Sequence, residues 1–154
     1  MDNSSFASYF MNNQDIWFNP QKKYDRIISE KFSILLDTTE IFNNLILVNS
    51  NKELFEFILI FDQLPYYVFR DDIKQIEKYQ KFSYQLAIQL IDNDRFNEFT
   101  NVEKCFIMLP LRHSNNLQDN YKILKKVIEL RKEDTSSILK RFYRATLLKI
   151  GTLI

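Results

Sequence analysis

Apolar residues recur at intervals of three and four along most of this chain, which is the spacing of helices with one buried face. The run from Tyr24 through Ile27, Ile28 and Leu35 shows this spacing. One glycine and three prolines in 154 residues leave few residues that favour tight turns. No segment alternates apolar and polar residues over the length of a strand, and no glycine-rich phosphate loop occurs. The sequence therefore predicts an all-α fold.

Helix caps together with the apolar spacing predict about seven helices. Asn19 and Pro20 are suited to begin the first helix, and Ser50 to cap the third. Thr100 and Glu103 have the spacing of a capping box that begins the fifth helix. The expected helices cover about residues 20–36, 37–48, 51–63, 71–92, 100–110 and 116–131, with a last one that begins at Asp134. Short connections between them favour an antiparallel bundle.

The third expected helix is apolar nearly all round. Its residues from Leu54 to Phe61 include only one polar side chain, Glu56. A buried strand is the alternative interpretation, but the apolar run is long for a strand and its neighbours have helical spacing. This pattern predicts a helix at the centre of the fold.

Length and composition suit one compact domain. A chain of 154 residues that is 45% hydrophobic can bury most of its apolar surface, so we expect one helical domain over residues 16–154 and a flexible or loosely packed N-terminus over residues 1–15. The one cysteine, Cys105, lies in an apolar run and is expected in the core.

No apolar run is long enough to span a membrane and no secretion leader is recognisable, which predicts a cytoplasmic protein. Abundant Asn, Ile and Lys are typical of AT-rich genomes, and if the source is a virus the location is the host cytoplasm.

Charge is distributed unevenly along the chain. Residues 1–120 carry 12 Lys and Arg against 17 Asp and Glu, a net charge of −5, whereas residues 121–154 carry 9 against 3, a net charge of +6. The basic C-terminal helices either pack against an acidic body with solvated outer faces or bind an acidic partner such as RNA.

Polar side chains follow the two most apolar stretches. Asp62 and Gln63, with Arg70 shortly after, close the first stretch, and Arg112, His113 and Ser114 close the second. If neighbouring helices alternate in direction, the third and fifth helices run parallel and their C-terminal ends meet. Asp62 and His113 would then be neighbours, beside helix N-termini that attract anions.

Each of these residues has a chemical and a structural interpretation. Asp62 could orient His113 for general acid–base catalysis, or cap its helix and pair with Arg70. Arg70 could clamp a carboxylate or phosphate, or pair with Asp62 or Asp71. Ser114 is suited to cap the sixth helix. Because His113 is the only histidine and Cys105 the only cysteine, no metal site and no cofactor are expected.

These blocks resemble a known family, the bacterial "domain of unknown function 924" family. Its pattern runs roughly L-L-D-Q-F-P-R-N, then Y-M-P-x-x-H-S-E-D, then F-G-R-F-P-H-R-N. The positions that match the first two blocks are Asp62, Gln63, Pro65, Arg70, Phe106, Pro110, His113 and Ser114. The similarity extends from Trp17 to about Arg144, and the segment from Arg141 to Arg144 resembles the third block without its H-R-N.

The resemblance implies a tetratricopeptide-like arrangement of helices, although no 34-residue repeat is evident in the sequence. The chain departs from the family pattern where carboxylates are expected. Asn115 and Asn116 replace an acidic pair, Gln80 replaces an Asp, and Asn120 stands for a later Gln. Amides keep hydrogen bonding but remove bases and metal ligands.

These observations favour a non-catalytic helical interaction module that binds a protein or peptide partner, or a small anion, at its polar end. The expected binding residues are Asp62, Gln63, Arg70, Arg112, His113, Ser114, Asn116 and Arg144. A small hydrolase or transferase that acts on an anionic substrate through Asp62, His113 and Arg70 is the alternative. An RNA-binding accessory protein that uses the basic C-terminal helices is the third hypothesis, and no membrane binding is expected.

Overall fold

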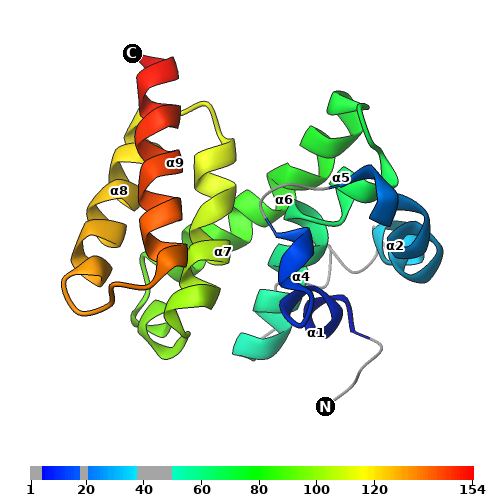
Figure 1. Cartoon of the computed structure of the whole chain (residues 1–154), viewed down its shortest axis with the longest axis horizontal. Helices are drawn as coiled ribbons and strands as arrows, with labels where there is room; N and C mark the ends of the chain where they lie inside the picture. The colour runs from blue at the N-terminus through cyan, green and yellow to red at the C-terminus, as the bar shows by residue number, and fades with distance from the viewer. Residues whose placement is uncertain (1–4, 18–20, 38–49) are drawn as a thin grey trace. The chain divides into compact units, whose positions relative to one another are not determined.

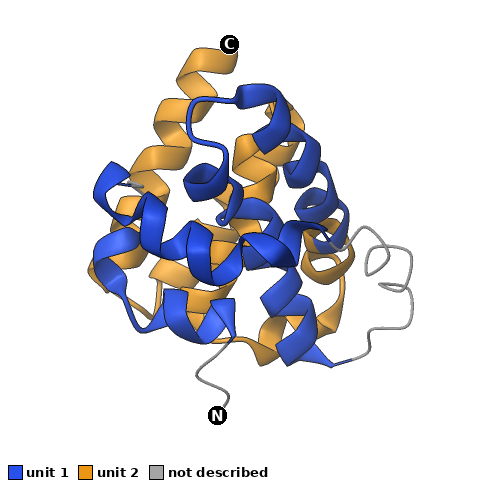
Figure 2. Ribbon diagram, turned by 90° about the vertical axis from the view of Figure 1, so that its right-hand side faces the viewer, with its two compact units in different colours: residues 1–86 blue, residues 87–154 orange. Residues whose placement is uncertain are grey.

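The computed structural model describes residues 5–17, 21–37 and 50–154 and divides the chain into two compact units, residues 1–86 and 87–154 (Figure 2). Within these described residues all regular structure is helical and none is strand, which confirms the all-α prediction. Among them, no helix combines the length and apolar character needed to cross a membrane. The single domain expected over residues 16–154 stays a prediction.

The first unit is organised around α4, Asn51–Asp62 (Figure 1). Ser50 caps this helix, since its hydroxyl oxygen accepts a hydrogen bond from the Glu53 N–H at 3.1 Å. Most of the helix is buried, and it contacts α1, η3 and α5, which confirms the prediction of a central helix instead of a strand. The other elements of the unit are α1 (Phe6–Met11), η1 (Gln14–Ile16), η2 (Lys22–Tyr24), α2 (Asp25–Phe32), η3 (Ser33–Asp37), α5 (Pro65–Val68) and the first part of α6 (Ile73–Ile91).

The N-terminal residues 6–11 form α1, which differs from the loosely packed segment that the sequence suggests. Phe6 and Phe10 are both 0% exposed. The Glu56 carboxylate of α4 accepts hydrogen bonds from the Phe6 and Ala7 N–H groups at 3.0 and 2.9 Å. A negative charge at these N–H groups is favourable because they have no partner within the helix. A carboxylate 50 residues away in the sequence thus holds the start of α1.

The helix expected over residues 20–36 is divided into three shorter elements, η2, α2 and η3. Only the middle one is α-helical, and Ile28 and Phe32 supply its buried face. The expected capping pair, Asn19 and Pro20, and nearly all of the helix expected over residues 37–48 lie outside the described residues.

The second unit contains η5 (Asp94–Glu98), α7 (Asn101–His113), α8 (Leu117–Arg131) and α9 (Ser137–Leu153), and the last three helices pack on one another. The capping box is confirmed, because Thr100 Oγ1 accepts from the Glu103 N–H at 3.1 Å and Glu103 Oε1 accepts from the Thr100 N–H at 2.8 Å. Side chains from all three helices are fully buried in the core of this unit: Cys105, Ile107, Met108, Leu111, Ile123, Val127 and Leu139.

Pro110 does not end the fifth expected helix, so that boundary prediction is wrong. α7 continues through Pro110 to His113, and the Ser114 N–H donates to the Pro110 carbonyl at 3.2 Å. A proline inside a helix removes one backbone hydrogen bond, and its ring crowds the carbonyl of the residue four positions earlier. The turn that follows buries Leu111 completely, which favours its helical form.

The last helix begins at Ser137, three residues later than predicted. Asp134 instead lies in the preceding connection, where its carboxylate accepts from Asn101 Nδ2 and from the Ser136 N–H, each at 2.8 Å. The bond from Asn101, followed by the Ser136 N–H, lowers the pKa of Asp134. Asp134 therefore holds the α8–α9 connection against the start of α7.

Candidate functional site

The residues predicted to form a site are divided between the two units. Asp62, Gln63 and Arg70 belong to residues 1–86, whereas Arg112, His113, Ser114, Asn116 and Arg144 belong to residues 87–154. The proximity of Asp62 to His113 stays a prediction, and each group has a local geometry of its own.

Asp62 and Gln63 end α4 in a buried position, with exposed fractions of 1% and 3%. Gln63 Nε2 donates to Asp62 Oδ2 at 2.7 Å. From α6, Gln80 Nε2 donates to the Tyr66 hydroxyl at 2.8 Å and to the Asp62 carbonyl at 3.3 Å. A carboxylate at position 80 could donate neither bond. The Gln80 amide therefore joins α6 to the end of α4.

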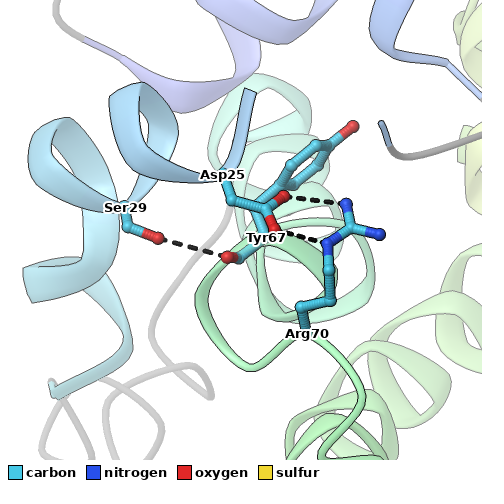
Figure 3. A network of polar contacts seen from close by, with 4 residues as sticks. All are labelled: Asp25, Ser29, Tyr67 and Arg70. Carbon is cyan, nitrogen blue, oxygen red and sulfur yellow. Dashed lines mark hydrogen bonds and ion pairs between the residues drawn. The ribbon is translucent and has the colours of Figure 1, made fainter. Parts of the chain in front are cut away.

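Arg70 pairs with Asp25 at the start of α2, a partner that the structural interpretation did not name (Figure 3). Both Nε and Nη2 of its guanidinium bind the carboxylate, and the Nη2–Oδ1 distance is 2.8 Å. The Arg70 and Asp25 side chains are 26% and 20% exposed. The hydrogen bond to Asp25 raises the pKa of Arg70. This two-point geometry is the one expected for an arginine that clamps an anionic ligand, but a side chain of the protein occupies it.

Tyr67 lies beside this ion pair and links α5 to two other segments. Its hydroxyl donates to the Ile16 carbonyl at 2.7 Å. Its own carbonyl accepts from the Ser29 hydroxyl at 3.2 Å, as Figure 3 shows. Burial raises the pKa of Tyr67, and the positive charge of Arg70 opposes this shift. The ring is 2% exposed, so the hydroxyl acts as a structural donor and not as an acid near neutral pH.

The α7–α8 junction contains the second group of predicted residues, and Ser114 does not cap α8 as expected. Ser114 is the C-cap of α7, and its hydroxyl donates to the Leu111 carbonyl at 2.6 Å. The N-cap of α8 is Asn116, whose Oδ1 accepts from the Asp119 N–H at 3.0 Å.

Asn120, a fully buried residue of α8, connects both ends of this junction. Its Nδ2 lies 2.9, 3.4 and 3.5 Å from the carbonyl oxygens of Asn116, Ser114 and Leu111. Its Oδ1 is buried and has no hydrogen-bond partner among the residues that the structure describes. Three carbonyls around the nitrogen fix the orientation of the amide, since the oxygen could not accept from any of them.

The remaining candidates differ in exposure. The Arg112 guanidinium lies 4.6 Å from the centre of the Phe142 ring, and its Nη1 is 3.4 Å from the Phe142 carbonyl oxygen. His113 is half-buried at the end of α7, whereas Arg144 is exposed on α9. Arg112 of α7 therefore contacts Phe142 of α9, where these two helices pack together.

Two kinds of chemical site can be checked among the described residues, a reactive thiol and a cluster of metal ligands. Cys105 is 0% exposed, and burial raises its pKa to about 12, so that its reactive thiolate is scarce at neutral pH. In the described part of the chain, no three His, Cys, Asp or Glu side chains gather as metal ligands would. Sequence reasoning missed Asp25, Tyr67 and Glu56. Of these, only Asp25 has a sequence signal, since it is an acidic residue in the first turn of a helix.

Comparison with known proteins gives one match. The family model for a bacterial protein of unknown function, DUF924, matches residues 5–149. No curated protein and no solved structure matches the chain.

Proposed function

This chain belongs to the DUF924 family of bacterial proteins of unknown function, and we propose that it serves as a cytoplasmic helical binding module for a protein or peptide partner. The family membership supplies no activity, so the proposal depends on the residues of this chain.

The observation that carries the proposal is the pairing of Arg70 with Asp25. An enzyme that acts on an anionic substrate needs a cationic group available to that substrate. The guanidinium expected in this role binds a carboxylate of the protein through two nitrogen atoms. A bidentate pair of this kind would have to break before Arg70 could bind a substrate in the same way.

The α7–α8 junction supports the same proposal. The Ser114 hydroxyl lies 2.6 Å from the Leu111 carbonyl oxygen and 3.2 Å from Asp119 Oδ2, and Asn116 Oδ1 accepts from the Asp119 N–H. Such capping bonds satisfy the groups that helix ends leave without partners. A hydroxyl that caps a helix is poorly suited to act as a nucleophile, which favours a structural role for this cluster.

The basic C-terminal helices favour a protein partner over RNA. Bases of single-stranded RNA stack on exposed aromatic faces. On these helices the Arg131 guanidinium already lies over the Tyr143 ring, 4.4 Å from its centre. A cation of the chain therefore covers one face of the Tyr143 ring, which a base would need for stacking.

The test compares turnover with binding in the same variants. The whole chain, His113→Gln and Asp62→Asn are assayed with chromogenic phosphate monoesters, phosphate diesters and carboxylate esters between pH 6 and 9, and folding is checked by circular dichroism. We expect no hydrolysis above buffer for any of the three proteins. Partner capture by the unchanged chain and by His113→Gln, quantified by mass spectrometry, should give the same set of proteins.

One result would overturn the proposal. If the unchanged chain hydrolyses an ester and folded His113→Gln loses on the order of a hundredfold or more of that rate, His113 acts in general acid–base catalysis and the chain is an enzyme.

A further inference from the structure

Two lysine side chains of the second unit meet at one phenylalanine ring. Lys104 of α7 and Lys126 of α8 lie over Phe96 of η5, with their Nζ atoms 5.6 and 5.3 Å from the ring centre. The two helices pack side by side, as Figure 1 shows. Both distances are measured from the same point, so the two ammonium groups belong to one local group. We call these three residues, Phe96, Lys104 and Lys126, the Phe96 cluster.

The Lys104 ammonium is an unusual charge for the inside of a protein. Lys104 is 9% exposed and Phe96 is 5% exposed, whereas Lys126 is half-buried. Lysine is rarely buried to this extent unless an anion accompanies it, because the charge loses its hydration. The face of an aromatic ring attracts a cation, but the ring has no net charge to balance the ammonium.

Acidic residues are present nearby in the sequence, but none of them pairs with these lysines. Asp92 pairs instead with Lys122, one turn before Lys126 on α8. Glu103, next to Lys104, accepts a backbone N–H in the capping box. Neither Lys104 nor Lys126 forms an ion pair with a residue that the structure describes. Two positive charges therefore lie at one ring without an ion pair that balances either.

The position of Lys104 in its helix adds to this excess of positive charge. Lys104 is the fourth residue of α7, and helical side chains lean towards the helix N-terminus. The N-terminus of a helix carries partial positive charge, which disfavours a cation and attracts an anion. Like charges gathered in this way repel one another, and an anion bound among them would remove the repulsion.

We propose that the Phe96 cluster binds a phosphate group, either of free phosphate or of a phosphate ester. Two ammonium groups match the charge of a phosphate dianion, whereas one carboxylate would balance only one of them. The compact ammonium of lysine binds phosphate as a point charge, while flat two-point recognition of a carboxylate favours arginine. Because Lys126 is only half-buried, a ligand can reach it from solvent. This site goes beyond the proposed function, which concerns a protein or peptide partner.

The test measures binding of inorganic phosphate to the whole chain. Isothermal titration calorimetry at pH 8, where phosphate is mostly a dianion, should give a saturable signal. In thermal melting, phosphate should raise the midpoint more than sodium chloride does at the same ionic strength, because a ligand that binds only the folded chain stabilises it.

A phosphoserine peptide, titrated in the same way, distinguishes the two sources of the phosphate group. Tighter binding of the peptide than of inorganic phosphate would assign the cluster to a phosphate ester. Equal or weaker binding of the peptide would assign it to free phosphate. Either result supports the cluster as a phosphate site.

Variants of the chain locate the site. Lys104→Met and Lys126→Met should each weaken phosphate binding by about tenfold or more, since each removes one of the two charges. Lys125→Met is the matched control, because Lys125 is the exposed neighbour of Lys126 on α8, and it should bind like the unchanged chain. Without phosphate, Lys104→Met should melt no lower than the unchanged chain, because methionine fills similar space without a buried charge. Circular dichroism confirms that each variant is folded.

Several results would overturn the Phe96 cluster as a phosphate site. They are the absence of saturable phosphate binding, an equal effect of sodium chloride on melting, and unchanged binding in both Lys104→Met and Lys126→Met. An equal loss of binding in Lys125→Met would show a general attraction to the basic surface instead of a site. If Lys104→Met melts lower and phosphate does not bind, Lys104 serves only to pack on Phe96. The ester assays of the proposed function measure turnover and not phosphate binding, so the two proposals fail separately.

Discussion

At the scale of single residues, the polar groups most suggestive of chemistry hold the protein together. Arg70 binds Asp25, Gln63 binds Asp62, and Asn120 closes the α7–α8 junction. Buried polar groups need such partners, because an unsatisfied one costs about 1–3 kcal/mol. A residue type that is common in active sites is therefore no evidence of catalysis until its partners are known.

The Arg70–Asp25 pair should contribute measurably to stability. We expect Arg70→Gln and Asp25→Asn each to lower the free energy of unfolding by about 1–3 kcal/mol, because each leaves a partly buried charge without its partner. Urea denaturation of both variants and of the double variant gives the coupling energy. The control is the Arg26–Glu30 pair, whose side chains are 88% and 66% exposed and whose coupling should be below about 0.5 kcal/mol. A coupling at Arg70–Asp25 no larger than in the control would contradict the structural role.

Cys105 should make stability depend on pH in the alkaline range. Its pKa is raised to about 12 in the folded chain, so the unfolded chain loses the thiol proton first as the pH rises. The contribution of the Cys105 thiol to the free energy of unfolding is complete below about pH 8.5, the pKa of the thiol in the unfolded chain. Above that pH the free energy of unfolding falls by up to about 1.4 kcal/mol per pH unit. Cys105→Ala should lower stability at all pH values through the cavity it creates but remove this part of the slope. Urea denaturation at pH 7 to 10.5 gives the free energy of unfolding of the unchanged chain and of Cys105→Ala. If that free energy falls with pH at the same slope in both proteins, the prediction is wrong.

At the scale of elements, local capping and distant contacts contribute to different helices. α4 and α7 begin at caps made by residues within four positions of each other. α1 has only six residues, and such short helices are not stable alone. Its start depends on Glu56 of another helix, and its aromatic side chains are buried.

Glu56→Gln should therefore loosen α1. The amide can accept only one of the two bonds and brings an N–H towards N–H groups, so we expect a loss of about 1–2 kcal/mol and faster hydrogen exchange in residues 6–11. Glu77→Gln is the control, because Glu77 is exposed on α6. Unchanged exchange in α1 would show that burial of Phe6 and Phe10 suffices to hold it.

At the scale of the whole molecule, residues 87–154 have a core of their own. Three helices pack on one another, and buried side chains come from each of them. The unit has 12 Lys and Arg against 8 Asp and Glu, a net charge of +4, whereas residues 1–86 have 9 against 12, a net charge of −3. Within residues 87–154 the positive charge is concentrated in residues 121–154, which carry +6, whereas residues 87–120 carry 3 Lys and Arg against 5 Asp and Glu, a net charge of −2.

Residues 87–154 expressed alone should fold. Small three-helix domains of this size are marginal but can be stable when their core is complete. We expect a helical circular dichroism spectrum and a cooperative thermal transition. A disordered spectrum, or a melt without a transition, would show that this unit needs the remainder of the chain.

The sequence by itself determined the helical class, the central α4, the capping box at Thr100 and the family. These features depend on residues within a few positions of each other, whose spacing fixes local hydrogen bonds and one buried face. Only the tertiary structure decided that Arg70 binds Asp25, that Glu56 holds α1, and that α7 continues past Pro110. Those outcomes depend on contacts between residues far apart in the chain, for which a single sequence carries no periodic signal, and on burial, which can outweigh a local preference such as that of proline to end a helix.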